Sequence, residues 1–203
     1  MQRSFANPLM KSKAHLVVLA AILLASCSAP APEHAPVIKA DKPFASAGSI
    51  EMKLDSGDYS IRASSGENIR VTFAGNIGNA VADLTTNGSH ANLEVRDTPH
   101  SNFRATVEVP ATANLTIHLT AGNLDVGAIT GNKDIDSQAG NVTIATPTAD
   151  DYATVDAAVR IGNLGAGPFG ASGSGFSREL KWSGHGKFTL HASLGAGNLE
   201  LKH

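Results

Sequence analysis

The chain has 203 residues, of which 42% are hydrophobic and 17% charged, and its formal net charge is −2. A single cysteine excludes a disulfide framework and a site in which several cysteines bind a metal. Because the balance of charge is slightly acidic and no block of basic residues occurs, the composition also excludes an ordinary nucleic-acid-binding surface.

The amino terminus predicts an export signal. Arg3, Lys11 and Lys13 precede an unbroken apolar run, LVVLAAILL, over residues 16–24. A basic leader followed by a short apolar core is typical of a signal peptide. A membrane-spanning helix would need about 20 apolar residues, which this run does not supply. We therefore expect residues 1–26 to be a signal peptide.

The only cysteine, Cys27, directly follows Leu24-Ala25-Ser26, and this tetrapeptide resembles the lipobox of bacterial lipoproteins. The resemblance implies cleavage between Ser26 and Cys27 and acylation of Cys27 by membrane lipid. Two or more acyl chains give stable membrane attachment, whereas one chain gives only a marginal one. Ordinary secretory cleavage among these small residues is the alternative. Ser28, where an inner-membrane lipoprotein tends to have aspartate, favours the outer membrane if the organism has one.

A proline- and alanine-rich segment follows the cysteine. We expect residues 27–44 to be the lipidated cysteine and a spacer, since alternating Pro and Ala form extended, semi-rigid chains of about 3 Å per residue. Residues 45–203 are the right size for one domain. Without the leader, the chain has 13 basic and 18 acidic residues, which gives a net charge of −5.

The domain over residues 45–203 is predicted to be built from a repeat. Gly-Asn pairs begin at Gly122, Gly131, Gly140, Gly162 and Gly197. Glycine reaches positive φ without penalty and asparagine tolerates it, so each pair marks a corner. The residues after most corners alternate between apolar and polar, as in Leu-Asp-Val, which indicates a short half-buried strand. Lys133 breaks the alternation in its unit, and we expect that strand to buckle or to lie at an edge.

Corners nine residues apart leave no room for helical crossovers and predict an all-β fold. The chain could coil into a β-solenoid resembling a parallel β-helix, or form an antiparallel β-sandwich. Ala121-Gly-Asn and Ala139-Gly-Asn lie eighteen residues apart. Such near-identical units favour the solenoid, because identical side chains, asparagines included, stack well in parallel rungs.

The carboxyl terminus predicts a cap for the solenoid. Two alternating segments, residues 178–182 and 187–191, flank Ser-Gly-His-Gly over residues 183–186, which indicates a hairpin. A hairpin here would cover an edge strand that could otherwise pair with another chain. Trp182 and Phe188 are predicted to close the end as an aromatic plug. The alternative is that Trp182 stacks on a sugar ring in an exposed groove.

The units Gly-Asn-Leu-Asp-Val at residue 122, Gly-Asn-Val-Thr-Ile at residue 140 and Gly-Asn-Leu-Glu-Leu at residue 197 resemble the adhesin repeats of the DUF4097/DUF2807 group. The resemblance extends to residues 183–188 and covers most of residues 50–201. It implies a bacterial envelope protein with a β-solenoid-like domain, often behind a signal peptide or lipid anchor. That family supplies no catalytic residues, and asparagine replaces the aspartate that commonly follows its repeat glycine.

No catalytic, metal or cofactor site is predicted. Residues 165–170 have the letters of a dinucleotide loop, but no helix that could bind pyrophosphate follows. The histidines considered as metal ligands are His118, His185 and His191. Four aspartates could resemble the calcium-binding carboxylates of β-helical polysaccharide lyases: Asp134, Asp136, Asp150 and Asp151. Such enzymes also need a basic residue to abstract a proton from the sugar ring, and Arg160 is the only nearby candidate. We interpret both sets as ordinary surface residues.

The predicted function is that of an exported, lipid-anchored envelope protein, not an enzyme, with an adhesin-like or scaffold β domain. A glycan-binding module is the alternative, and a polysaccharide-acting enzyme comes third. The expected partners are membrane lipid through acylated Cys27 and an envelope polysaccharide or surface protein, and nucleic acid is not among them.

Overall fold

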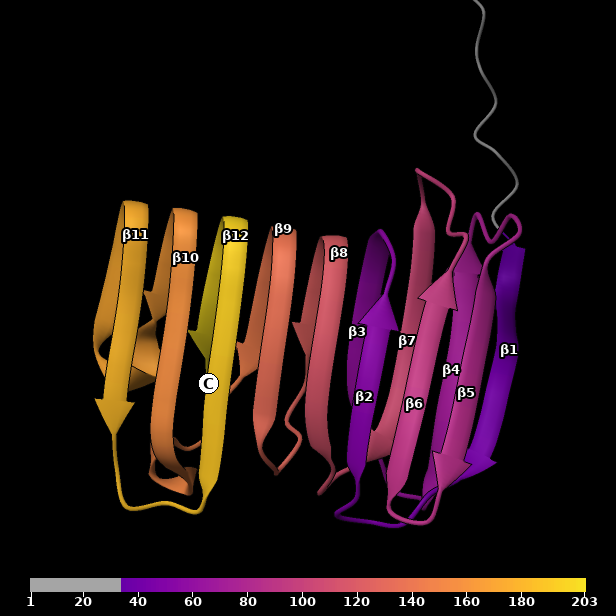
Figure 1. The fold of residues 1–203 in the computed structure, drawn as a ribbon, viewed down its shortest axis with the longest axis horizontal. Coiled ribbons are helices and arrows are strands. Elements are labelled where there is room, and N and C mark those ends of the chain that lie inside the picture. Colours follow the sequence, from indigo (N-terminus) through magenta and orange to yellow (C-terminus); the bar gives the residue numbers. More distant parts are fainter. Residues whose placement is uncertain (1–33) are drawn as a thin grey trace, which may run out of the picture. The chain divides into compact units, whose positions relative to one another are not determined.

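The structure, a computed structural model, describes residues 34–203 (Figure 1). The predicted signal peptide, its cleavage site at Ser26 and the lipidation site at Cys27 lie outside the described residues. Two short 3-10 helices, η1 (Ala149–Asp151) and η2 (Gly167–Phe169), interrupt an otherwise all-β fold, which confirms the predicted class.

Twelve strands form one mixed sheet that folds back on itself to enclose a core. In chain order they are β1 (His34–Pro43), β2 (Ser49–Leu54), β3 (Gly57–Ser64), β4 (Asn68–Gly75), β5 (Val81–Asn87), β6 (His90–Arg96), β7 (Phe103–Pro110), β8 (Asn114–Val126), β9 (Lys133–Ala145), β10 (Tyr152–Ala166), β11 (Ala171–Ser183) and β12 (Phe188–Lys202). Among residues 34–203, no helix is both long and apolar enough to span a membrane.

The long strands are the rungs of a solenoid. β8, β9, β12 and β10 lie parallel and in register, and each bends near its middle so that its two halves lie on different faces. Towards the other end, two short strands replace each long one: β2 and β3 pair along the two halves of β8. β6 and β7 continue the same two faces beyond them. This parallel stacking confirms the predicted solenoid.

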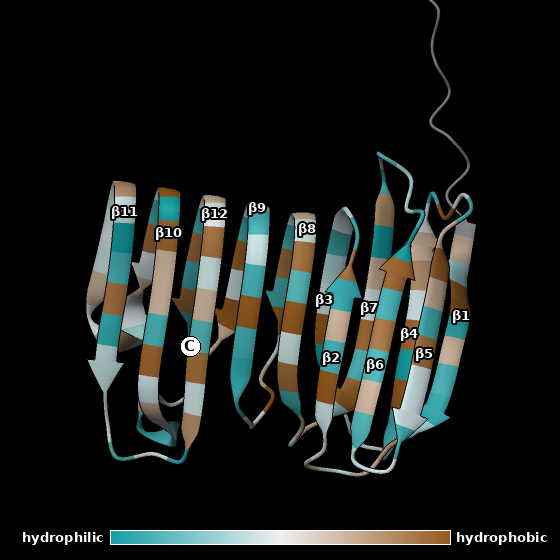
Figure 2. Cartoon of the chain, in the orientation of Figure 1, coloured by the Kyte–Doolittle hydropathy of each residue, from teal (hydrophilic) through white to brown (hydrophobic). Residues whose placement is uncertain are grey.

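The core forms because burial alternates along the strands, as the sequence pattern predicts. In β6 every second residue is buried, and Figure 2 shows the matching alternation of hydropathy along the rungs. Inward side chains such as Ile117, Ile135 and Ile144 are fully buried between the two faces. Removal of this apolar surface from water is the main force that holds the rungs together.

Stacked glycines form the bends. Gly122, Gly140, Gly197 and Gly162 occupy matching positions on neighbouring rungs, with φ between 118° and 140°. A Cβ on Gly140 would overlap the backbone carbonyl of Gly122 on the next rung. Glycine is therefore required both for its positive φ and for the close approach of the two backbones.

The strand that contains Lys133 is neither buckled nor at an edge, which corrects our expectation. β9 pairs with β8 on one side and β12 on the other, and Lys133 points inward between Leu115 and Leu190. Its Nζ donates hydrogen bonds to Ile129 O at 2.6 Å, Gly131 O at 3.3 Å and the Tyr152 hydroxyl at 3.1 Å. These oxygens replace water, so the strand tolerates a buried amine.

Strand order at the carboxyl-terminal end differs from chain order. β12 lies between β9 and β10, and β11 is outermost. Residues 183–186 therefore cross the end of β10 and do not form the predicted hairpin between β11 and β12. The hairpin that ends the solenoid is β10–β11, which is antiparallel and turns through η2. β12 takes the inner place because Gly197 and Asn198 match the corners of both neighbouring rungs.

The predicted aromatic plug is present. Trp182 and Phe188 are partly buried and pack against the core. The ring centroids of Trp182 and Phe169 lie 5.1 Å apart, and Phe169 also contacts Tyr152 edge-on. Phe169 belongs to η2, so the plug includes a residue of the glycine-rich loop at residues 165–170. This loop matches a dinucleotide-binding motif in sequence only and has a structural role here.

At the other end, the β domain begins earlier than residue 45. Residues 34–43, which the sequence pattern places in the spacer, form β1 and pair antiparallel with β4. Pro36 and Pro43 are compatible with this pairing because β1 is an edge strand, and its pairing contains two irregularities. The prolines and bulges also protect this edge from pairing with another chain.

Candidate interaction surface

Outward side chains of the rungs lie on two faces. We call the first face the side formed by β5, β6, β2, the first halves of β8, β9, β12 and β10, and the second half of β11. The second face contains β1, β4, β7, β3 and the remaining halves. Because neighbouring rungs are in register, outward residues form rows that run along the solenoid.

The second face carries a ladder of asparagines. Asn163 donates to Asn198 at 2.6 Å, Asn198 to Asn141 at 2.6 Å, Asn141 to Asn123 at 2.8 Å, and Asn123 to the Asp58 carboxylate at 2.6 Å. All four amides therefore donate in the same direction along the solenoid. The predicted stacking of identical residues is confirmed, and the side chains satisfy one another and stabilise the corners.

The first face carries acidic and basic groups on neighbouring strands. His118 Nδ1 lies 3.6 Å from Asp136 Oδ2, and His191 Nδ1 lies 4.0 Å from Asp156 Oδ2. A shallow groove of about 420 Å³ runs beside the first pair and includes Lys53 in its lining. The two histidines and their aspartates are about half exposed and Lys53 is more exposed still, so water screens their interactions strongly.

Apart from the two His–Asp pairs above, and Asp134, which lies opposite His191 on the neighbouring strand, the residues proposed from the sequence do not come together at one site. His185 lies in the exposed connection between β11 and β12, on the far side of β9 from His118. Asp134 and Asp136 project from β9, whereas Asp150 and Asp151 belong to η1. Arg160 lies on β10, two strands beyond β9. Within residues 34–203, no group of three or more His, Cys, Asp or Glu side chains is placed to hold a metal ion.

Two buried titratable groups face each other inside the core. Burial lowers the pKa of Lys133 to about 8, an effect that the nearby Asp151 partly offsets. Burial, together with a smaller effect of the negative Asp151, raises the pKa of Tyr152 to about 12. Sequence reasoning missed this contact, although the inward register of Lys133 signals that it needs polar partners. Neither group is accessible to a ligand, so we interpret the pair as structural.

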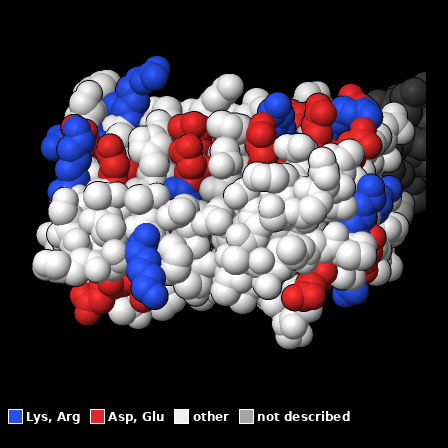
Figure 3. Space-filling view, turned by 60° about the horizontal axis from the view of Figure 1, so that its bottom comes forward, with Lys and Arg blue, Asp and Glu red and all other residues white. Residues whose placement is uncertain are grey.

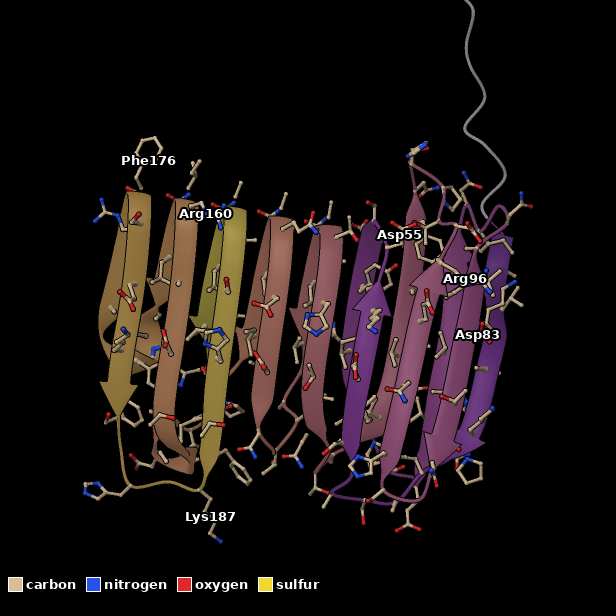
Figure 4. The ribbon with its side chains drawn as sticks, in the orientation of Figure 1. Asp55, Asp83, Arg96, Arg160, Phe176 and Lys187 are labelled. Atoms are coloured by element: carbon tan, nitrogen blue, oxygen red, sulfur yellow. The ribbon has the colours of Figure 1, made fainter. Side chains whose placement is uncertain are left out.

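Large exposed hydrophobic side chains occur at the two ends of the solenoid. Within residues 34–203 they are Val37 and Ile38 on β1, Ile161 on β10 and Phe176 on β11, the last of which is labelled in Figure 4. Phe176 is 75% exposed, the most of the four. All other aromatic residues in the described range are buried or partly buried, so no exposed aromatic strip is formed there.

Charge on the surface is mixed. Lys and Arg lie among Asp and Glu over the parts visible in Figure 3, so that view shows no broad region of one sign. Several outward pairs neutralise each other, including Arg62 with Asp125 at 2.6 Å and Arg70 with Asp41 at 2.9 Å. The Arg70 hydrogen bond lowers the pKa of Asp41, with a further contribution from Asn68.

Comparison with known proteins identifies similar folds only. No protein-family model and no curated protein matches the chain. A proposed cell adhesion protein from Clostridium sporogenes ATCC 15579 superposes with a TM-score of 0.53 at 11% identity, over 83% of this chain and 99% of that one. This similarity supports a common fold.

Two further structures align less well. They are a proposed adhesin from Bacteroides fragilis NCTC 9343, with 10% identity over 85% of this chain and 98% of that one, and a proposed lipid binding protein from Parabacteroides distasonis ATCC 8503, with 10% identity over 82% and 61%. Both have a TM-score of 0.27, which is too low to establish a common fold.

Proposed function

We propose that this chain is an exported bacterial lipoprotein whose solenoid serves adhesion or scaffolding at the cell envelope without catalysing a reaction. The observation that carries the proposal is the in-register stacking of the rungs. It turns outward side chains into fixed rows on extended faces, which suits contact with another large surface. The similar fold of the clostridial cell adhesion protein supports the same role.

The proposed anchor is Cys27, acylated after cleavage behind Ser26. Support comes from the Leu-Ala-Ser-Cys sequence behind a basic and apolar leader. Since β1 begins at His34, the spacer from Cys27 can reach at most about 25 Å even if fully extended. Lipid at Cys27 would therefore keep the solenoid close to the membrane surface, at the outer membrane if the organism has one.

Metabolic labelling with a fatty acid tests the anchor. We expect the wild-type chain to carry label and to fractionate with membranes, and the Cys27→Ser variant to carry none and to appear in the soluble fraction. The Ser28→Ala variant, which leaves Cys27 in place, serves as the control and should label like wild type. Labelling of the Cys27→Ser variant, or an unlabelled wild type, would contradict the proposal.

The contact role is tested with the purified solenoid and isolated envelopes. We expect saturable binding that is lost after protease treatment or polysaccharide removal, and the treatment that abolishes binding identifies the class of partner. The glycan-binding alternative receives no support from Trp182, because this side chain packs on Phe169 and the core. Absence of saturable binding to envelopes would contradict an adhesive role.

A further inference from the structure

The outer row of the bends changes character at the carboxyl-terminal end of the solenoid. In register, this row consists of Ala121, Ala139, Ala196, Ile161 and Phe176. The first three rungs use alanine, so the bend itself requires no large side chain. Ile161 and Phe176 are nevertheless 48% and 75% exposed. Two large apolar side chains are therefore exposed to solvent at positions where the other rungs have alanine.

Two arginines flank these apolar side chains. Arg160 and Arg178 both line a groove of about 300 Å³. Neither forms an ion pair with another residue in the range 34–203, and their neighbour Glu179 is bound to Lys181 at 2.6 Å. The Arg178 side chain lies along the glycine-rich part of β11, close to Gly175. We call Arg160, Ile161, Phe176 and Arg178 the ridge patch.

The ridge patch lies on the same edge of the solenoid at which the described chain begins. His34 pairs with Gly75, and Gly75 pairs with Phe103, which lies beside the first stacked bend at Gly57 and Gly122. Figure 4 shows Phe176 and Arg160 on this edge and Lys187 on the opposite edge. A surface that holds the chain through residues before His34 can therefore also meet the ridge patch.

We propose that the ridge patch docks on an anionic phospholipid surface. Phe176 and Ile161 would enter the boundary between headgroups and acyl chains, where exposed apolar side chains are stabilised, and the two guanidinium groups would bind lipid phosphates. The identity of the membrane rests on the proposed anchor at Cys27. With contacts at both ends, the solenoid lies lengthwise along the bilayer.

A second copy of the chain is the competing occupant, because β11 has an unpaired edge. Two-fold pairing of β11 with itself through its central bend would bring both copies of Arg178 close to the symmetry axis. Within the described part of the chain, neither arginine is paired with an acidic side chain that would offset this repulsion. The charges thus favour an anionic surface over self-association.

Vesicle sedimentation tests the proposal with residues 31–203, a compact unit that contains the entire described core and lacks Cys27. We expect this unit to bind vesicles of equal parts phosphatidylglycerol and phosphatidylcholine, and to bind pure phosphatidylcholine far less. Phe176→Ala together with Ile161→Ala should weaken binding about tenfold. Arg160→Gln and Arg178→Gln should each weaken it about fivefold.

The matched control is Lys187→Gln, which removes a basic group from the opposite edge and should leave binding unchanged. The alanine variants restore the residue of the other rungs, and circular dichroism should show an unchanged melting temperature. Equal binding by wild type and the double alanine variant would overturn the proposal. So would displacement by millimolar inorganic phosphate, which indicates a small-anion site, or a lipid-free dimer that Phe176→Ala dissociates.

This experiment and the labelling experiment fail independently. The vesicle assay uses an unacylated unit, so it can succeed when Cys27 proves not to be lipidated. Conversely, labelled Cys27 combined with no vesicle binding leaves the anchor in place and removes only the docking of the ridge patch.

Discussion

At the scale of single residues, Lys133 shows how this fold accommodates a misplaced charge. Its position belongs to a row of inward aliphatic side chains, yet three oxygens surround the amine. Burial lowers its pKa from 10.5 to about 8. The folded chain therefore holds this proton less tightly than the unfolded chain does, and folding with a charged Lys133 is unfavourable.

This shift predicts an unusual pH dependence of stability. Between about pH 8 and about pH 10 the unfolded chain binds more protons at Lys133 than the folded chain, so the free energy of unfolding should rise by up to about 2 kcal/mol. Above about pH 10 the raised pKa of Tyr152 reverses the trend, because only the unfolded tyrosine ionises there. Urea unfolding across this range measures the effect.

The control for this titration is the variant pair Lys133→Met and Lys187→Met. The first variant should lose the rise in stability, whereas the second, at an exposed position, should retain it. A rise of equal size in the Lys133→Met variant would show that another group is responsible.

At the scale of the element, the stacked bend is the feature on which each long strand depends. Each bend glycine has a positive φ, and its Cα also lies close to the backbone of the neighbouring rung. Both features require glycine at the same position. The asparagine that follows joins the hydrogen-bonded ladder, so the Gly-Asn pair closes the corner through both backbone and side chain.

Gly140→Ala is expected to lower the free energy of unfolding by more than about 3 kcal/mol, because the methyl group combines an unfavourable φ with overlap of the neighbouring rung. Gly66→Ala is the matched control, since an added Cβ there meets nothing within 4 Å. We expect it to change stability by less than about 0.5 kcal/mol. Denaturant unfolding of both variants measures this difference. A similar loss of unfolding free energy in the two variants would argue against stacked bends.

At the scale of the whole molecule, a solenoid is stabilised by contacts between adjacent rungs, so its ends need special treatment. The β1 end has prolines and bulges on its edge strand. At the β11 end, Trp182 and Phe169 cover the last part of the core. The β1 end is therefore protected along its edge strand, whereas the β11 end is protected by aromatic side chains that cover the core.

Trp182→Ala should destabilise the β11 end by about 2 kcal/mol. This loss is smaller than that expected on truncation of a fully buried tryptophan, because Trp182 is only partly buried. Hydrogen exchange is the suitable measurement. We expect amides of β10 and β11 to lose protection while those of β8 and β9 retain it. Trp182→Phe should preserve most of the protection, and a uniform loss along the solenoid would contradict an end-specific role.

The local features of this protein can be predicted from its amino-acid sequence. Gly-Asn corners and period-two alternation predict bends and half-buried strands, because these preferences act within a few residues. The eighteen-residue spacing of Gly122 and Gly140 further predicts parallel rungs. Leu-Ala-Ser-Cys predicts the lipid anchor, which lies outside the described residues.

Which strands are neighbours becomes apparent only in the three-dimensional structure. Alternation in residues 178–182 and 187–191 is the same whether these strands pair with each other or lie on opposite sides of β10, and the structure shows the second arrangement. The strand at residues 34–43, the oxygens around Lys133 and the exposure of Phe176 depend in the same way on distant partners. Pairing energy is summed over residues far apart in the chain, so no local pattern can report it.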